Sequence, residues 1–310
     1  GYLLVRAGAD PVLSLFGCVI IAYGIMLVWY YRLLIQYFPQ GRGTSLAFME
    51  WIDRYPQLMG VGTCIGIGLY IHLILMWASP IGVQIKGLFY SAPGYDVPAL
   101  FAFLSILITT INFVTSVEVN FYPKYQIYFG LFNHGGTLID IENARDDMIE
   151  TLLKELSYAF AKQFFATVVF IVGGTLLIPR LPFGFTEEML GIYRVLCVGY
   201  AFYATGNCIM LMSLYFADNV GALLSSVVYA VCSVLGTWFT MNGDSRYYGF
   251  GFLIAGIIFT ATALMRLISY LKKLDYHVIS KQPLIQSKKT GPATRLSRKL
   301  EERYCEKEKI

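Results

Sequence analysis

The chain has 310 residues, of which 56% are hydrophobic and only 14% charged, and its formal net charge is +4. Soluble domains carry about 25% charged residues, so this composition excludes a soluble enzyme, a disordered chain and a disulfide-rich secreted scaffold. The hydrophobic residues come in blocks of about 20, the length that crosses a bilayer as a helix. We therefore predict an all-α polytopic membrane protein.

Seven apolar blocks are long enough to cross the membrane. In chain order they are Pro11–Tyr37, Pro56–Trp77, Val97–Val119, Ser157–Pro179, Leu190–Phe216, Val220–Met241 and Tyr248–Leu271. Gly and Pro are frequent within the blocks, and Tyr and Trp gather near their ends, as is typical of transmembrane helices.

The distribution of Lys and Arg predicts the orientation. From Leu271 to Ile310 there are 11 Lys/Arg against 5 Asp/Glu, and basic loops stay in the cytoplasm. We therefore place the connections 38–55 and 120–156 and the charged tail 285–310 in the cytoplasm, with a short helix at 294–304. An odd number of spans then puts Gly1 outside, which fits a chain that lacks helices upstream and does not begin with Met.

The connection 120–156 contains an amphipathic segment, 137–156. Thr137 and Asp140 form a relative of the capping box, and apolar residues follow at helical spacing. The acidic side carries Asp146, Asp147 and Glu150. Because acidic residues repel anionic lipid, we expect this helix to dock on a partner protein or on the cytoplasmic end of the bundle.

Hydroxyl and amide side chains follow one face of the third span. They recur every three or four residues and so share one face of a helix: Ser105, Thr109, Asn112, Ser116 and Asn120. The functional interpretation is the wall of a hydrated path that contacts sugar hydroxyls. The structural interpretation is contact between helices, since such residues commonly hydrogen-bond across membrane interfaces.

Ionisable residues at membrane depth are candidates for a functional role. Glu118, Lys162 and Arg194 lie in or near spans, and a pair between Glu118 and Lys162 is one possible arrangement. Lys162 and Arg194 also lie where a long side chain can reach the membrane surface. His72 lies deeper, where a lone histidine is more often a packing residue.

Three further residues are candidates for the substrate path. Tyr95 and Asp96 precede the third span on the predicted outer side, where an aromatic ring can stack on a sugar and a carboxylate can accept its hydroxyl protons. The alternative for this region is an interfacial aromatic belt. Asn207 lies beside Gly206 and marks either a broken helix or an ordinary interhelical contact.

The chain shows no motif of an enzyme or a metal site. The six cysteines form no CxxC pair, the three histidines are scattered, and GxSxG, HExxH and Walker A motifs are missing. We predict no catalytic residue, no metal and no cofactor.

Several stretches together carry a resemblance to a known family. They are MEWIDRYPQL (49–58), YDVPALFAFLS (95–105), FVTSVEVNFYPKY (113–125), GGTLIDIENARDDM (135–148), YFADNVGALL (215–224), YYGFGFLIAG (247–256) and LDYHVISKQPL (274–284). This pattern resembles the Pel exopolysaccharide transporter family, PelG. That family is similar to the multidrug/oligosaccharidyl-lipid/polysaccharide flippase superfamily, whose members build two lobes of six helices.

The resemblance implies that 49–284 is the C-terminal lobe and that 1–48 holds the last helix of the N-terminal lobe and the inter-lobe loop. It further implies export of a hexosamine-rich exopolysaccharide across the bacterial cytoplasmic membrane for the biofilm matrix. The implied partners are a cytoplasmic glycosyltransferase and a cyclic-di-GMP-responsive membrane subunit. Two alternatives stay open: a lipid-linked oligosaccharide flippase or ion-coupled exporter, and a non-transporting membrane anchor for a polysaccharide synthase.

Overall fold

The computed structural model describes residues 8, 10–38, 46, 48–180, 184–280 and 291–307. Within these residues, seven helices are long and apolar enough to cross a membrane. The prediction of an all-α polytopic membrane protein is therefore confirmed. The chain divides into two compact units: Gly1–Arg54 together with Lys289–Ile310, and Tyr55–Lys288.

The first unit contains three described helices: α2 (Pro11–Tyr37), α3 (Met49–Arg54) and α13 (Pro292–Lys307). The Asp53 carboxylate of α3 caps the first turn of α13, because Thr294 N–H donates to Asp53 Oδ2 at 2.7 Å and Thr294 Oγ1 donates to the same oxygen at 2.6 Å. The predicted helix at 294–304 is thus present and longer than expected. Residues 285–290 and 308–310 of the predicted tail lie outside the described residues.

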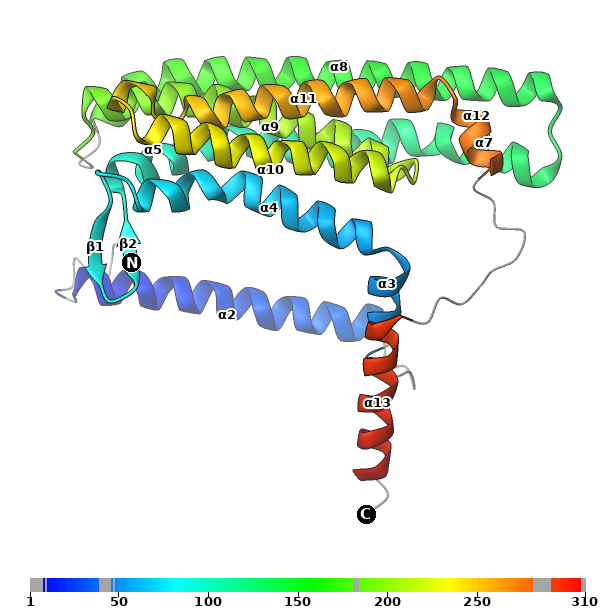
Figure 1. Ribbon diagram of the computed structural model, residues 1–310, viewed down its shortest axis with the longest axis horizontal. Coiled ribbons are helices and arrows are strands. Elements are labelled where there is room, and N and C mark those ends of the chain that lie inside the picture. Colours follow the sequence, from blue (N-terminus) through cyan, green and yellow to red (C-terminus); the bar gives the residue numbers. More distant parts are fainter. Residues whose placement is uncertain are drawn as a thin grey trace. The chain divides into compact units, whose positions relative to one another are not determined.

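The second unit holds the remaining helices (Figure 1). They are α4 (Pro56–Trp77), α5 (Pro93–Phe103), α6 (Leu107–Ser116), α7 (Tyr122–His134), α8 (Leu138–Leu177), α9 (Glu187–Tyr215), α10 (Asn219–Met241), α11 (Phe250–Leu271) and α12 (Leu274–Ser280).

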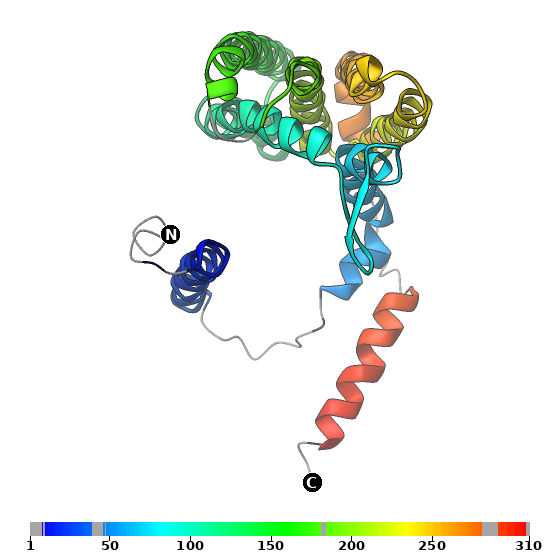
Figure 2. The ribbon, with the colours of Figure 1, turned by 90° about the vertical axis from the view of Figure 1, so that its left-hand side faces the viewer.

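Helices α9, α10 and α11 form the centre of this unit, which Figure 2 shows nearly end-on. Helix α11 packs on both α9 and α10; α4 packs on α10; α5 and α8 pack on α9. Small residues allow α11 to pack closely against α9 and α10. A Cβ atom at Gly206 of α9 would lie 2.6 Å from Phe259 Cδ1 of α11, and one at Gly236 of α10 would lie 2.8 Å from the Gly251 carbonyl oxygen of α11. Such small residues are the usual means of helix association in membranes.

Local sequence signals explain where these helices begin and end. Pro56 and Pro93 stand in the first turns of α4 and α5, where a missing N–H costs nothing. Gly135 ends α7 with a φ of 81°, in the left-handed region that favours glycine. The side chains of Thr186 and Asp218 cap α9 and α10.

The third span is longer than predicted. The expected helix Val97–Val119 lies inside a continuous helical run, Pro93–Phe132. This run contains one 3₁₀ turn (η1, Leu104–Ile106) and one π-helical turn (η2, Val117–Phe121). Pro123 follows η2 closely and has no N–H to donate to the Val119 carbonyl. The turn before it is therefore wider than an α-helical turn, and Tyr122 N–H donates to the Val117 carbonyl, five residues back, which is the π-helical pattern.

The predicted amphipathic helix 137–156 and the predicted span Ser157–Pro179 form one helix, which corrects the boundary between them. Helix α8 runs unbroken from Leu138 to Leu177 because no Gly or Pro occurs before Gly173. The capping box is confirmed, since Asp140 N–H donates to Thr137 Oγ1 and Thr137 N–H donates to Asp140 Oδ2, both at 3.2 Å. Met148 and Leu152 are buried in the bundle, so this segment docks on its own unit.

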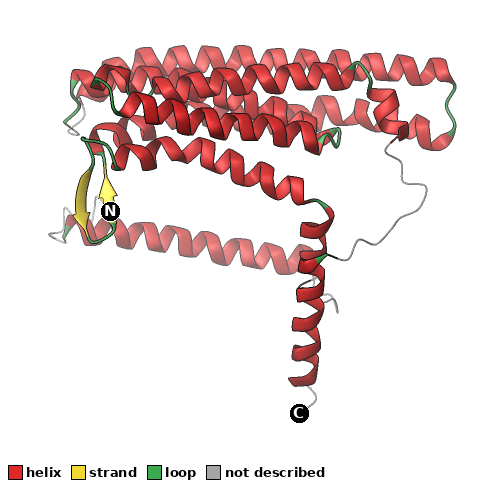
Figure 3. Ribbon diagram, viewed as in Figure 1, coloured by secondary structure: helices red, strands yellow, loops and turns green. Residues whose placement is uncertain are grey.

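A β-hairpin follows α4, in the connection to α5 (Figure 3). Strands β1 (Val83–Lys86) and β2 (Phe89–Ser91) pair antiparallel, and Gly87 with a φ of 60° forms the turn. We refer to the end of the bundle with this hairpin as the hairpin end, and to the opposite end as the α12 end.

Candidate functional site

The polar face of the third span lies against α8. Thr109, Asn112 and Ser116 line a narrow groove together with residues of α8. We call this the α6–α8 groove; it is lined by Thr109, Asn112, Phe113, Ser116, Glu155, Tyr158, Ala159 and Lys162. Ser105, the first residue of the predicted stripe, is buried outside the groove, where its Oγ donates to the Ala102 carbonyl of its own helix at 2.7 Å.

Glu155 is the centre of this groove. Ser116 Oγ donates to Glu155 Oε2, and Asn120 Nδ2 donates to Glu155 Oε1 at 3.0 Å. Two residues of the predicted stripe therefore share one carboxylate. Ser116 directly precedes the π-helical turn η2 and Asn120 lies within it, and π turns of this kind occur frequently at functional sites.

The groove is narrow, and it lies at the surface of the unit, since Asn112 and Tyr158 of its lining are exposed. Its void measures about 10 Å³, which is at the lower limit for holding a single water molecule. Thr109 is 2% exposed, and its Oγ1 has no hydrogen-bond partner among the described residues. A buried hydroxyl without a partner costs free energy, so this position suits a group that arrives from outside the protein.

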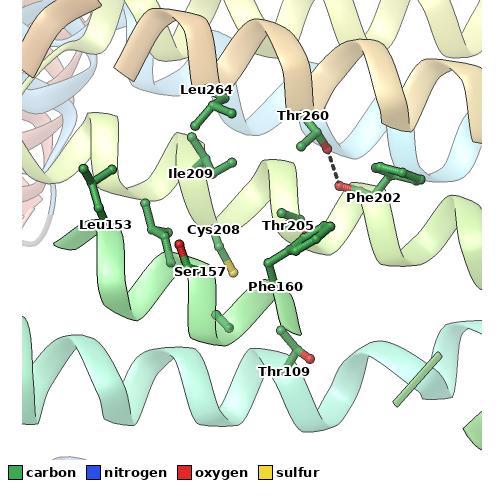
Figure 4. Close-up of a pocket in the computed structure, with 12 residues that line it drawn as sticks. Thr109, Leu153, Ser157, Phe160, Phe202, Thr205, Cys208, Ile209, Thr260 and Leu264 are labelled. Carbon is green, nitrogen blue, oxygen red and sulfur yellow. Dashed lines mark hydrogen bonds between the residues drawn. The ribbon is translucent and has the colours of Figure 1, made fainter. Parts of the chain in front are cut away.

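A larger pocket adjoins the groove at Thr109 (Figure 4). It has a volume of about 360 Å³, and side chains of α6, α8, α9 and α11 surround it. Most of its lining is apolar; the polar groups are the hydroxyls of Thr109, Ser157, Thr205 and Thr260 and the thiol of Cys208. Thr205 and Thr260 donate to backbone carbonyls, at 2.9 Å to Ala201 and 2.7 Å to Phe202. A mostly apolar pocket with a few hydroxyls is typical of small-molecule sites.

The three charged candidates do not meet one another. Lys162 Nζ lies 4.1 Å from the centre of the Tyr158 ring, a cation–π contact within the groove. Glu118 is exposed on η2, and the described residues contain no ion pair between it and Lys162. Arg194 lies near the hairpin end, where its Nε donates to Thr175 Oγ1 at 3.2 Å.

Tyr95 and Asp96 have structural partners. Tyr95 is fully buried, and its hydroxyl lies 2.9 Å from Nδ1 of the equally buried His72. His72 is therefore a packing residue with a satisfied ring nitrogen. The Asp96 carboxylate accepts hydrogen bonds from Trp77 Nε1 at 3.1 Å and from Ala92 N–H at 2.9 Å, so it ties α4 to the start of α5.

Asn207 lies in an unbroken helix. Helix α9 is continuous from Glu187 to Tyr215, which excludes the broken-helix interpretation in this conformation. The neighbouring Gly206 serves close packing on Phe259 instead. Asn207 itself is half-buried.

The acidic residues of α8 are exposed at the α12 end. Asp147 pairs with Lys124 at 2.5 Å, and Asp146 pairs with Arg145 at 2.9 Å. Glu150 is exposed as well. Arg145 also reaches Asp275 of α12 at 2.5 Å, so this surface combines a structural link with exposed acidic side chains.

Sequence reasoning missed Glu155 and Tyr158. The signal was available: Glu155, Tyr158, Ala159 and Lys162 recur at helical spacing on one face. We missed this spacing because we assigned Glu155 to a cytoplasmic amphipathic helix, 137–156, that ended before the predicted span. A carboxylate beside hydroxyl, amide and ammonium groups can bind protons, cations or sugar hydroxyls.

The sequence matches the PelG family, described as "Putative exopolysaccharide Exporter (EPS-E)", over residues 2–279. No curated protein and no solved structure matches it. The match spans most of the chain and agrees with the seven apolar helices. The chain therefore belongs to the PelG family of exopolysaccharide exporters and is a multi-pass membrane protein with a role in polysaccharide export.

Proposed function

We propose that this chain moves an exopolysaccharide of the Pel type across the bacterial cytoplasmic membrane for the biofilm matrix. The family match over residues 2–279 is the observation that carries this proposal. A polar route through an apolar shell is what such transport requires, because sugar hydroxyls must exchange water for other hydrogen-bonding partners. The hydroxyl and amide groups of the α6–α8 groove supply such partners within a span.

The groove has to widen for this role. In this conformation its void of about 10 Å³ admits no sugar. Separation of α6 from α8 would join Thr109, Asn112 and Ser116 to the larger pocket, which Thr109 already borders. We therefore assign the narrow groove to a resting state of the transport cycle.

Polymer secretion in cells tests this assignment. Replacing Asn112 and Ser116 by Leu removes two groove hydrogen-bonding groups and should abolish secretion while the protein level in the membrane stays unchanged. Thr115→Leu is the matched control, because Thr115 is exposed on the same helix and its hydroxyl bonds to the Ile111 carbonyl. Normal secretion by the double variant would reject the groove as part of the route.

We further propose that the α12 end faces the cytoplasm. Supporting this is the basic chain after Leu271, with 11 Lys/Arg against 5 Asp/Glu. A cysteine placed near residue 290 should then resist a membrane-impermeant thiol reagent in intact cells and react after permeabilisation. Reaction in intact cells would reverse the assigned sidedness.

The acidic residues of α8 are a proposed docking surface for the cytoplasmic glycosyltransferase or the cyclic-di-GMP-responsive subunit. Asp146 and Asp147 have side chains that are 70% and 55% exposed, and Glu150 is exposed beside them. Reversing the three charges to Lys should abolish co-purification of the glycosyltransferase. Reversal of Glu187 and Glu188 at the hairpin end is the control, and equal loss there would argue against a specific surface.

A further inference from the structure

The larger pocket lies at the middle of two membrane-spanning helices. Phe202 stands next to the midpoint of α9, and Thr260 stands at the midpoint of α11. The bond from Thr260 Oγ1 to the Phe202 carbonyl at 2.7 Å puts these two midpoints at the same level. Both helices are long and apolar enough to cross a membrane. The medium beside the pocket is therefore lipid hydrocarbon.

The pocket opens to this medium past an apolar rim. Leu153 and Phe160 of α8 and Leu264 of α11 line the pocket and are exposed. Its inner wall is α9, whose Cys208 and Ile209 are buried. An apolar molecule dissolved in the bilayer can thus enter the pocket between exposed hydrocarbon side chains, without crossing a polar layer.

The chemistry of the lining disfavours charged ligands and ligands with many hydroxyls. None of the described residues that line the pocket carries a charge. Thr205 and Thr260 already donate their hydroxyl protons to backbone carbonyls. A charged or sugar-like ligand would lose its water here without gaining enough hydrogen bonds in return. In this conformation the pocket therefore suits a molecule that is mostly hydrocarbon.

Thr109 adds one position for a polar atom. Its hydroxyl can both donate and accept, is buried, and has no partner among the described residues. Figure 4 shows Thr109 on the side of the pocket opposite Thr260 and Leu264. A ligand that spans the pocket would meet hydrocarbon at Leu264 and a free hydrogen-bonding group at Thr109.

We propose that the larger pocket binds a neutral single-chain lipid from the bilayer. The hydrocarbon chain lies against α9, and one oxygen of the lipid forms a hydrogen bond with the Thr109 hydroxyl. The volume of about 360 Å³ lies in the range of small-ligand pockets. The proposal stands on the cavity and its lining, so it does not depend on whether the chain moves polysaccharide.

Photo-crosslinking to the whole chain in lipid vesicles tests the site. The probe is a medium-chain alcohol that carries a diazirine on its hydrocarbon chain. Adducts should concentrate on residues 153–160 and 202–209, and an excess of decanol should remove them. Helix α10 contributes no residue to the pocket lining, so adducts on it measure the background and should resist decanol. Adducts spread evenly over the exposed helix faces, or insensitive to decanol, would overturn the proposal.

A bulky residue at the rim should close the pocket. Ser157 lines the pocket and is exposed, so Ser157→Trp should fold and should largely lose the decanol-sensitive adducts. Ser269→Trp is the matched control, because Ser269 is an exposed serine of α11 outside the pocket lining. Equal labelling of the pocket in both variants would show that the probe does not enter where we propose.

Thr109→Val tests the polar contact separately. Valine keeps the shape of the side chain and removes only the hydroxyl, so the affinity for decanol should fall about three- to tenfold. Competition by decane, which has no oxygen, should stay at the wild-type level. Unchanged competition by decanol in Thr109→Val would overturn the role of Thr109. None of these measurements uses transport, so failure here is distinct from failure of the proposed function.

Discussion

Arg266 of α11 and Asp218 at the start of α10 form a two-pronged ion pair. Arg266 Nε lies 2.7 Å from Asp218 Oδ2, and Arg266 Nη2 lies 2.9 Å from Asp218 Oδ1. Asp218 also accepts from Gly221 N–H at 3.2 Å, so one carboxylate both caps α10 and binds α11. The turn between α9 and α10 is thereby locked to the neighbouring helix.

The two partners of this pair differ in burial, and the difference predicts unequal mutational effects. The Asp218 side chain is 3% exposed, whereas that of Arg266 is 39% exposed. Arg266→Met leaves a buried carboxylate without its cation and should cost about 2 kcal/mol, after allowance for the exposed arginine. Asp218→Asn keeps a capping side chain and leaves an arginine that can reach water, so it should cost about 1 kcal/mol. Thermal unfolding in detergent measures both, and a larger loss for Asp218→Asn would contradict this order.

The contact between α10 and α11 predicts a strong effect of a single methyl group. A Cβ atom at Gly251 would overlap the backbone of Gly236, which cannot rotate away as a side chain can. Gly251→Ala should therefore destabilise the bundle by about 1–3 kcal/mol. Gly173 of α8 is the control, because a Cβ atom there meets nothing within 4 Å. Equal unfolding temperatures for the two alanine variants would show that α10 and α11 are not in close contact.

The capping of α13 by Asp53 predicts a pH dependence in the first unit. The hydrogen bonds from the Thr294 hydroxyl and the Thr294 N–H lower the pKa of Asp53 below its ordinary value of 3.8. A lowered pKa means that the carboxylate stabilises the docked helix above that value and loses this effect as pH falls through the folded pKa. Spin labels on α3 and α13 should report a short distance at neutral pH that broadens under strongly acidic conditions.

Asp53→Ala should show the broadened distance at every pH, since alanine has no oxygen that can accept the hydrogen bonds from Thr294. Glu50→Gln is the control: Glu50 lies 4.0 Å from Arg298, and both side chains are largely exposed, so this pair contributes little. A neutral-pH distance that Asp53→Ala leaves unchanged would show that Asp53 does not hold α13.

The sequence predicts the spans well because hydropathy depends on each segment alone. Pro11–Tyr37 and Pro56–Trp77 have the predicted bounds in the structure, and Thr137 caps α8 as its spacing with Asp140 indicates. The length of α8 was harder to predict. The acidic residues before Leu156 suggested a separate surface helix, although no Gly or Pro interrupts the chain before Gly173. Hydropathy indicates where a segment changes from a polar to an apolar environment, but it does not indicate whether the helix ends there. A helix continues through such a change when no Gly or Pro interrupts the backbone, as in α8.

The candidate site was predicted only in half. The spacing of Thr109, Asn112 and Ser116 correctly puts them on one face, but their partner Glu155 lies 39 residues beyond Ser116. Which helix covers a polar face depends on how the bundle packs, and no local pattern contains that information. The π-helical turn that brings Ser116 and Asn120 to one carboxylate follows from Pro123 only once the helix is known to continue through it.

Transport by the purified chain is the most direct test of the central claim. The chain and a polysaccharide synthase, its proposed partner, are reconstituted into vesicles, with the synthase exposed to sugar nucleotides outside. Export predicts that new polymer accumulates inside, protected from an added glycosidase, and that replacing both Asn112 and Ser116 by Leu abolishes this protection. Polymer made at the normal rate but fully open to the glycosidase with the wild-type chain would show that the chain only anchors the synthase.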